Sequence, residues 1–489
     1  MTLMTWTFSV PLGITHEEVV EWIEKHYSKE LEKKKNETDK IFFLNNKVEE
    51  AIRSIQLEKS ALNILKNEDP ALYLMKAIRD IHVGEESTVA WHIFSGLSGG
   101  LKDRRSTIHL ALTGNSGKGK SSIQEHVGLI FENIETVTSS SAKSQFYKAD
   151  AGQLPDSGIM RFDEAEGSEE ALILERALTD RGLTIPTHDT ITVNRKYKQI
   201  RISQINAVWR NSVNPPADEQ VSNRYVFLNV NESSKQDRLV AEKQVKEYCY
   251  DLQYNKETPC IELARAIVTK IKEKPIKIII PYGYLIESSD YGNRRSLPKF
   301  LALIKTITYL YRFQRRIIND YCFATRKDVE IAQLLWEQAA QSEKTHTNKA
   351  QEQLLSILPD DETNAMDRKQ LSNLIGKGIS SILNYLRPLI LNGIVSYKEV
   401  FDGTKKKFYW KIKDCQRVSF SIDWNKIKVE DLWNKIKETV INLDGVDEYN
   451  FYDAIMDDTI PEELMTLLKN PEKLGEESLK MKTIEIDRL

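Results

Sequence analysis

The sequence predicts an α/β domain built on a parallel sheet, and three observations support this fold class. First, Thr107–Thr113 is a short, β-rich apolar run followed by a Gly-rich turn and a helix-like stretch, Ser121–Asn133. Second, further apolar runs of strand character occur at Gly158–Phe162, Ile205–Arg210 and Tyr225–Val230. Third, helix-like stretches separate several of these runs. Strands that alternate with helices are joined by crossovers, which make the sheet parallel and place helices on both of its faces.

Length and composition narrow the class of protein. The 489 residues leave room for roughly three folding units of ordinary size. A net charge of only −3, with 29% charged residues, means that any nucleic-acid contact must come from local basic patches. The four cysteines lack CxxC spacing, which argues against a zinc ribbon or a disulfide framework and fits a reducing compartment. We see no signal peptide and no apolar run long enough to span a membrane, so we expect a cytoplasmic protein without a membrane partner.

Residues 114–121 carry a phosphate-binding motif. The stretch GNSGKGKS matches GxxxxGK[ST] at each fixed position. Glycines let the backbone wrap around phosphate oxygens, and the helix that follows adds its positive N-terminal dipole. We expect Lys120 to reach the β- and γ-phosphates and the Ser121 hydroxyl to bind Mg²⁺, so ATP and Mg²⁺ are the predicted cofactors. Lys118 occupies no fixed position of the motif and is expected to face solvent. The predicted contact set for the nucleotide is Gly114, Asn115, Ser116, Gly117, Lys118, Gly119, Lys120, Ser121 and Ser122.

A second apolar run ends in an acidic pair, Asp163-Glu164. In a P-loop enzyme such a pair has two tasks: Asp163 would hold Mg²⁺ through water, and Glu164 would orient or deprotonate the attacking water. Arg161 interrupts the run, which departs from the usual all-apolar strand. The predicted metal contacts are therefore Ser121 and Asp163.

A polar residue is also expected at the tip of the next strand. Asn211 follows Ile205–Arg210, where its side chain would touch the γ-phosphate and the lytic water. Asn214 is a competing candidate, and both asparagines also suit an ordinary turn.

Two arginine positions fit a role in phosphoryl transfer. Arg224 lies just before an apolar strand, where ring ATPases place an arginine that stabilises the transition state in a neighbouring subunit. Arg294 and Arg295 open a later helix, from which one of them would contact nucleotide as part of a lid.

The order of these features resembles the minichromosome-maintenance (MCM) branch of AAA+ helicases. It is most similar to the helicase-like ATPase domain of archaeal and phage primase-associated proteins. The resemblance covers about residues 70–340, and its more specific stretches are FDEAEGSEEAL (162–172), SNRYVFLNVNESSKQDRLV (222–240), RRSLPKFLALIKTITYLYRFQR (294–315) and ATRKDVEIAQLLW (324–336).

The resemblance implies a hexamer-like ring with ATP sites at subunit interfaces and movement on single-stranded DNA during replication of a mobile element. Arg295 is preferred to Arg294 because its spacing to Leu297 fits the Arg-x-Leu start of the family helix. A cysteine-rich zinc motif and a primase segment are lacking, so priming is not expected. The residues that would take the family's catalytic roles are Lys120, Asp163, Glu164, Asn211, Arg224 and Arg295.

Residues 190–202 have the signature of a β-hairpin. The stretch alternates, turns at a polar Asn-Arg-Lys and alternates again. In the related helicases a hairpin at this point enters the ring channel. We expect Arg195, Lys196 and Lys198 to contact DNA phosphates, with a nearby tyrosine as a stacking face; an ordinary solvated turn is the alternative.

Residues 350–412 have the pattern of a winged helix. Asp402-Gly403 indicates a hairpin turn, and Lys405, Lys406 and Lys407 just after it would make a basic wing for duplex DNA. Such modules also serve as protein-interaction modules. The expected helices are 350–358, 368–376 and 379–391, and the expected strands are 394–400 and 407–412, with a turn at 401–404.

These segments predict an α/β P-loop NTPase with an AAA+ core that acts as a ring helicase on DNA, and we expect a homo-oligomer, a hexamer. A DNA-dependent remodeller or loader, and an initiator in which ATP only switches a DNA-binding protein, remain as alternatives. The predicted units are a charged helical N-terminal region (1–70), the AAA+ core (71–235), a helical lid region (236–340), the winged helix (350–412) and an acidic helical tail (413–489).

Overall fold

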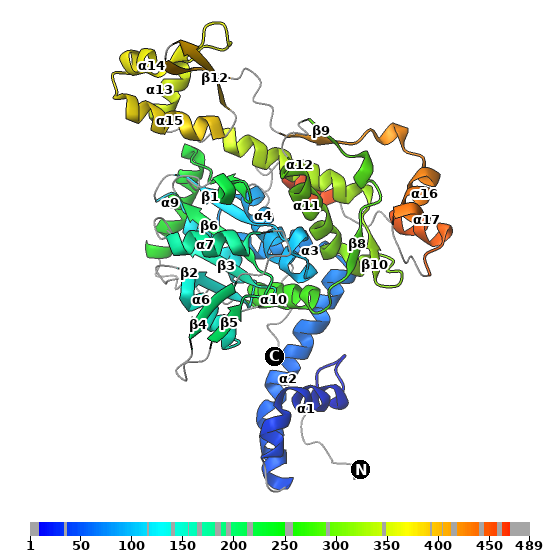
Figure 1. Cartoon of the computed structure of the whole chain (residues 1–489). Coiled ribbons are helices and arrows are strands. Elements are labelled where there is room, and N and C mark those ends of the chain that lie inside the picture. Colours follow the sequence, from blue (N-terminus) through cyan, green and yellow to red (C-terminus); the bar gives the residue numbers. More distant parts are fainter. Residues whose placement is uncertain are drawn as a thin grey trace.

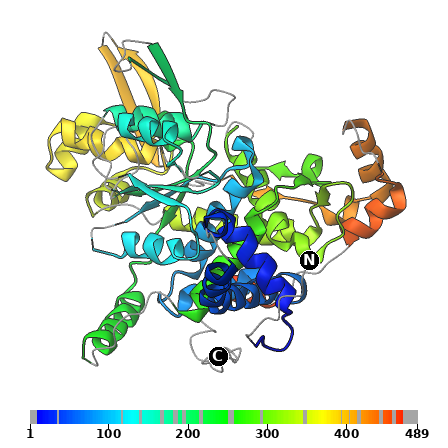
Figure 2. The same ribbon diagram turned by 90° about the horizontal axis from the view of Figure 1, so that it is seen from below.

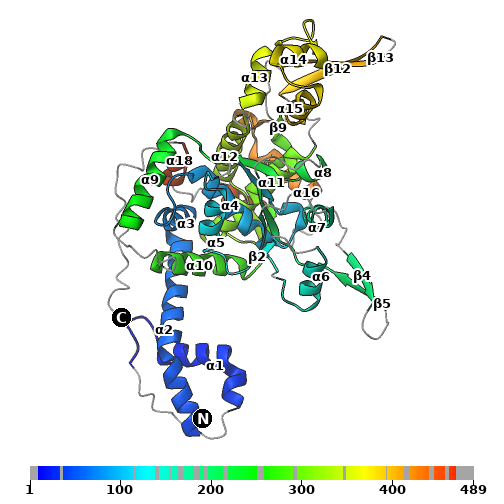
Figure 3. The same ribbon diagram turned by 90° about the vertical axis from the view of Figure 1, so that its left-hand side faces the viewer.

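The computed structural model describes residues 9–33, 37–114, 117–137, 142–154, 156–163, 169–180, 187–191, 197–212, 219–249, 258–289, 294–344, 349–391, 394–402, 404–411, 418–439, 445–456 and 462–469. An α/β body lies at the centre, and two parts project from it on opposite sides (Figure 1). One part is formed by the N-terminal helices and the other by residues 349–411 (Figure 3). No helix in the described ranges is long and apolar enough to cross a bilayer.

The body is organised around a five-stranded, all-parallel sheet, as the sequence predicts. The strand order is β2-β3-β6-β1-β7. Four of these strands were expected from their apolar runs, whereas β2 was not, because its sequence IETV is short and half polar. The strands are β1 (Leu110–Thr113), β2 (Ile134–Val137), β3 (Ile159–Asp163), β6 (Ala207–Ser212) and β7 (Val226–Asn229).

Alternating side chains give the sheet two buried faces. Leu110 and Leu112 enter one hydrophobic cluster, and Ala111 between them enters the other. Helix α5 (Lys120–Gly128) covers the first face, whereas α6 (Ala142–Asp150) and α7 (Glu169–Leu178) cover the second. The predicted α/β architecture with helices on both faces is therefore present.

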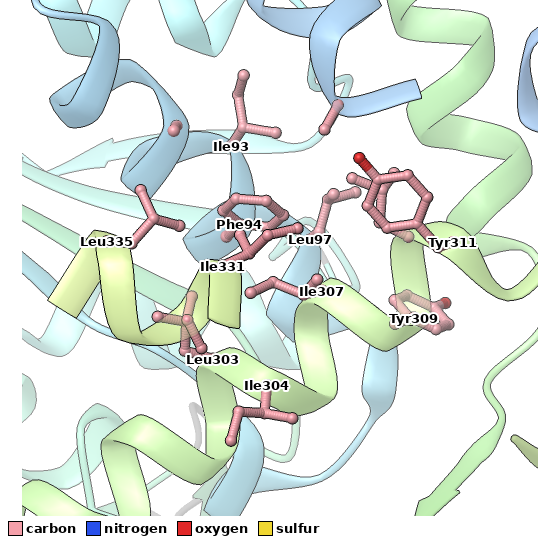
Figure 4. Packing of buried hydrophobic residues seen from close by; sticks show 14 of the residues in the cluster. Ile93, Phe94, Leu97, Leu303, Ile304, Ile307, Tyr309, Tyr311, Ile331 and Leu335 are labelled. Carbon is pink, nitrogen blue, oxygen red and sulfur yellow. The ribbon is translucent and has the colours of Figure 1, made fainter. Parts of the chain in front are cut away.

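The helix-rich region after the sheet packs into the same core as the first face. Ile93 and Phe94 of α4 interlock with Leu303 of α11 and Ile331 of α12 (Figure 4). The helices of this layer are α3 (Pro70–Arg79), α4 (Glu86–Ser98), α10 (Pro259–Lys272), α11 (Ser296–Tyr311) and α12 (Arg326–Lys344). The apolar residues of α11 are buried against α4, and this packing holds α11 in the core.

The C-terminal segment is helical and carries an apolar face. Phe420 stacks on Phe300 of α11 with ring centroids 4.4 Å apart, and Leu467 joins the same core. Its elements are β14 (Phe420–Ser421), α16 (Val429–Thr439), α17 (Glu448–Met456) and α18 (Glu462–Lys469).

At the other end of the chain, α1 (His16–Glu32) packs across the lower part of α2 (Glu37–Asn67), and the two helices share a small core of their own (Figures 1 and 2). Thr15 and Glu18 cap α1 reciprocally in a capping box. Helix α2 then packs on α10 and so anchors the pair to the body.

Residues 349–411 fold around a separate hydrophobic cluster. The three helices match the predicted ranges closely, but the hairpin strands are longer than expected. Phe401 pairs with Lys405 and Asp402 with Thr404, so residues assigned to the turn continue the ladder, which satisfies their backbone groups. Gly403 lies outside the described residues. The elements are α13 (Lys349–Ile357), β11 (Met366–Asp367), α14 (Arg368–Ile375), α15 (Ile379–Leu391), β12 (Val395–Asp402) and β13 (Thr404–Lys411).

The remaining elements connect these layers. They are β4 (Thr187–Ile191), β5 (Tyr197–Arg201), α8 (Glu219–Ser222), α9 (Ser234–Cys249), β8 (Lys277–Ile279), β9 (Glu287–Ser288) and β10 (Tyr321–Phe323).

Candidate nucleotide-binding site

The phosphate-binding motif forms the turn between β1 and α5. Gly117 and Gly119 have φ angles of +79° and +86°, in the left-handed region. A Cβ atom added at either position would meet nothing within 4 Å. Backbone conformation, not lack of space, therefore requires glycine at both positions.

The start of α5 is built for an anion. Gly119 is the N-cap residue and no side chain caps the first turn. Lys120 is half-buried, and its Nζ donates to the Gly114 carbonyl oxygen at 2.8 Å, which draws the ammonium over the loop. Ser121 and Ser122 follow in the first turn, and the Ser122 hydroxyl lies 3.3 Å from His126 Nδ1. These groups suit a triphosphate with its Mg²⁺, because backbone N–H groups, a lysine and a hydroxyl converge at one helix N-terminus. Two predicted contacts, Asn115 and Ser116, lie outside the described residues.

Lys118 does not simply face solvent, as expected from the motif. Its Nζ lies 2.7 Å from an Asp237 carboxylate oxygen on α9, and its side chain is 30% exposed. The ion pair ties the phosphate-binding turn to α9, a contact that motif spacing cannot reveal.

The acid strand ends beside the strand that carries Asn211. In the parallel register, Asp163 of β3 is the partner of Asn211, and Asn211 is the partner of Leu112. Neighbouring strands lie about 4.8 Å apart, so the backbones of Asp163, Asn211 and Thr113 meet at the carboxyl edge where the phosphate-binding turn begins. Asn211 is 3% exposed. Glu164 and the competing Asn214 lie outside the described residues, as does the side chain of Asp163.

Arg224 lies at the opposite edge of the sheet from Lys120. It precedes β7, whose first residue, Val226, pairs with Leu110 and whose last residue, Asn229, pairs with Thr113. The four-residue strand alone rises about 13 Å, so Arg224 is remote from its own phosphate-binding turn.

The surroundings of Arg224 are partly buried and rich in arginine. Its guanidinium donates to the Arg176 carbonyl oxygen at the end of α7. Burial lowers the pKa of Arg224; Asp180 raises this pKa, whereas Arg295 and Arg176 lower it.

Arg295 is not placed for a lid over its own nucleotide. It is the N-cap residue of α11, and Lys299 in the first turn of α11 donates to the Tyr225 carbonyl oxygen at 2.6 Å. The start of α11 therefore lies beside Arg224 at the amino edge of the sheet. Packing of the apolar α11 in the core places Arg295 away from the phosphate-binding turn of its own chain, and its contact with a nucleotide stays a prediction.

The predicted hairpin is present as β4 and β5, between α7 and β6 (Figure 3). Its tip, with Arg195 and Lys196, lies outside the described residues. Lys198 pairs with Asp150 of α6 at 2.5 Å, so this lysine braces the hairpin against the body. Tyr197 is 69% exposed, and its hydroxyl donates to Asp189 at 2.7 Å.

The lysines of the second hairpin are not equivalent. Lys407 lies 3.0 Å from Glu399 and 4.0 Å from the Tyr397 ring centroid, and the hydrogen bond to Glu399 raises the pKa of Lys407. Lys406 pairs across the ladder with Val400, and the side chain of Lys405 lies outside the described ones. Phe401, near the end of the hairpin, is 80% exposed.

Two acidic residues, Glu85 and Glu175, belong to no sequence motif and were not predicted. Burial raises the pKa of Glu85 to about 7, and its carboxylate accepts from the Asn231 backbone N–H and the Thr88 hydroxyl. Glu175 is buried beneath the sheet and accepts from Arg210 and Tyr225. Within the described ranges, no group of three His, Cys, Asp or Glu residues could hold a metal ion by itself.

Comparison with known proteins supports the nucleotide-binding assignment. A family model described as "MTBMA_p00010 P-loop domain" matches residues 54–274, which include β1 to β7. The chain is also 24% identical over 301 residues to "Uncharacterized protein MTBMA_p00010" of Methanothermobacter marburgensis, an alignment that covers 59% of this chain and 37% of the relative. The chain thus spans little more than a third of that relative's length. The motif geometry, the parallel sheet and the family match together fit an α/β P-loop NTPase domain within residues 54–274.

Proposed function

We propose that the chain is an ATP-driven ring helicase or translocase that acts on DNA, of the MCM-like branch of AAA+ ATPases, in the replication of a mobile element. The observation that carries the proposal is the separation of Lys120 and Arg224 on opposite edges of one sheet. If an arginine so far from its own phosphates contacts a nucleotide, that nucleotide belongs to another subunit.

The geometry of the amino edge extends this argument. Arg224 and Arg295 lie together there, so both would face the nucleotide of a neighbour. A contact between unlike surfaces of identical subunits generates a closed ring when the rotation closes. Helix α9, which begins beside the phosphate-binding turn, also exposes apolar side chains further along, where Val245 is 58% and Tyr248 85% exposed, as expected for a surface that a neighbour covers.

The proposed mechanism assigns one task to each group. Lys120 and the N-terminus of α5 bind the triphosphate, while Asn211 and Glu164 orient the attacking water. Ser121 and Asp163 would hold Mg²⁺, which neutralises charge on the phosphates when it is bound. The neighbour's Arg224 stabilises charge that develops on the transferred phosphoryl group.

Two features support DNA as the polymer that is moved. The β4–β5 hairpin is inserted between α7, which follows the acid strand, and β6, the strand of Asn211, so a change at the nucleotide would reach the hairpin through these two elements. Tyr197 offers an exposed ring for stacking on bases. The module of residues 349–411, which we interpret as a winged helix, adds a basic β-ribbon for duplex DNA.

Mixing of two inactive variants tests the shared site. Lys120→Ala removes the phosphate contact and Arg224→Ala removes the arginine, so each variant alone is expected to be inactive. In random rings of a 1:1 mixture, about a quarter of the interfaces combine an intact turn with an intact arginine. ATP turnover should therefore reappear on mixing. Arg53→Ala, which removes an exposed arginine of α2 paired with Glu262, is the matched control and should remain active. Absence of turnover at all mixing ratios would contradict the shared site.

A further inference from the structure

Glu175 is a buried carboxylate that joins two strands of the sheet. Its side chain on α7 is 1% exposed. One oxygen lies 2.6 Å from Arg210 Nη1 on β6, and the other accepts from the Tyr225 hydroxyl just before β7. Arg210 and Tyr225 are themselves almost completely buried.

Both partners of Glu175 are neighbours in sequence of predicted site residues. Arg210 precedes Asn211, which lies beside the acid strand at the phosphate-binding edge. Tyr225 follows Arg224 at the opposite edge. The residue after Glu175, Arg176, accepts a hydrogen bond from the Arg224 guanidinium through its carbonyl oxygen. Two consecutive residues of α7 thus hold the segment that carries Arg224.

Helix α7 connects the two edges of the sheet. It begins shortly after Asp163, at the edge where phosphates bind, and its ten residues rise about 15 Å toward the amino edge. Leu174 and Leu178 fix it in the second hydrophobic cluster together with Val208 of β6. Because α7 is held rigidly by this packing, a displacement of its first residues, which follow Asp163, would also move Glu175.

Stability alone does not account for this arrangement. The desolvation of two buried charges largely offsets their attraction, so apolar residues of the same size would serve the core equally well. The carboxylate instead links two specific positions. One oxygen accepts a hydrogen bond from Arg210 of β6 and the other from Tyr225, just before β7, which fixes the distance between these segments.

We propose that Glu175 is a positioning residue that links the strand of Asn211 to Arg224. Nucleotide binding at one site then determines the position of the arginine that completes the site of the next subunit. This inference rests on the proposed function, in which Arg224 completes a neighbour's site. Glu175 acts through Tyr225 and Arg176, and it touches no nucleotide itself.

Placement of one substitution in the mixing experiment tests the inference. Tyr225→Phe removes the hydroxyl that donates a hydrogen bond to Glu175 and keeps the aromatic ring. In the Lys120→Ala subunit, which donates the arginine, it should lower the recovered turnover about tenfold, the effect of losing one hydrogen bond to a charged group. In the Arg224→Ala subunit, which has no arginine to position, it should change the recovered turnover less than twofold.

Two controls separate positioning from a loss of structure. Tyr309→Phe removes another buried tyrosine hydroxyl, which donates to the Ile271 carbonyl oxygen at 2.7 Å, and it should act equally in either subunit. A homogeneous Tyr225→Phe ring should lose kcat while KM for ATP stays within twofold. If Tyr225→Phe unfolds the chain, Glu175→Gln, which keeps the shape of the carboxylate, replaces it and should lower turnover more in the Lys120→Ala subunit than in the Arg224→Ala subunit, where only its contact with Arg210 matters.

The outcomes distinguish the two proposals. Equal loss in both placements, or no loss in either, would overturn the role of Glu175 while leaving the shared site intact. Absence of recovery from the parent pair of variants would overturn the shared site, and the inference with it.

Discussion

Replacement of Gly119 by alanine tests whether the backbone of the phosphate-binding turn binds the nucleotide. Gly119 has a φ of +86°, and an added Cβ meets nothing within 4 Å, so the whole cost arises from backbone conformation. A left-handed conformation costs a residue with a Cβ about 1–2 kcal/mol. Relief of this strain would turn N–H groups away from the phosphates. Loss of two charge-assisted hydrogen bonds, about 1.5 kcal/mol each, predicts at least ~100-fold weaker binding of ATP.

Gly376 provides a matched control for this substitution. It ends α14 with a φ of +72° and also has open space around its Cβ position. Gly376→Ala should cost a similar 1–2 kcal/mol, measured by urea unfolding, and leave nucleotide affinity unchanged. Affinity is measured by calorimetric titration with a non-hydrolysable ATP analogue and Mg²⁺. Binding by Gly119→Ala within threefold of the parent protein, or equal loss in both variants, would refute the reasoning.

Three further predictions follow from charged groups. Burial raises the pKa of Glu85 from 4.5 to about 7, so the folded chain binds this proton more tightly than the unfolded chain. The free energy of unfolding, measured by urea unfolding, should therefore fall as the pH rises between these values, and Glu85→Gln should flatten that slope. Asp328→Ala should cost about 3–5 kcal/mol, because it strands Arg315, whose side chain is 1% exposed; loss below 1 kcal/mol would contradict this. Glu399→Gln should strengthen duplex binding about threefold at low salt by releasing Lys407, as followed by fluorescence anisotropy; unchanged affinity would argue against a DNA-binding wing.

The sheet could be predicted because its signals are local. Apolar runs marked β1, β3, β6 and β7, and the glycines fixed the turn before α5. β2 was missed because IETV carries too few apolar residues to stand out, and it is a strand only because β3 pairs with it. The predicted strands of the second hairpin were also too short. Pairing with the opposite strand, rather than the sequence of either strand alone, determines where the ladder ends.

The site could be predicted in its parts but not in its spatial arrangement. Motif spacing singled out Lys120, Asp163, Arg224 and Arg295, but it could not show that Arg295 lies beside Arg224, at the edge of the sheet opposite Lys120. The contacts that create this arrangement join the start of α11 to Tyr225, and Glu175 to Arg210 and Tyr225, over long stretches of sequence. Lys118 and Lys198 were likewise assigned without their partners Asp237 and Asp150, because ion pairs between distant segments leave no mark in a single sequence.

The central claim, an ATP-driven ring motor that acts on DNA, is tested most directly by ATP turnover with and without single-stranded DNA. The same samples are weighed by mass photometry, and Glu164→Gln serves as the variant that cannot activate water. The account predicts turnover by a multimer that single-stranded DNA stimulates and that Glu164→Gln abolishes. Absence of turnover under all DNA conditions, together with ATP-dependent binding of duplex DNA, would contradict it and identify an ATP-switched initiator instead.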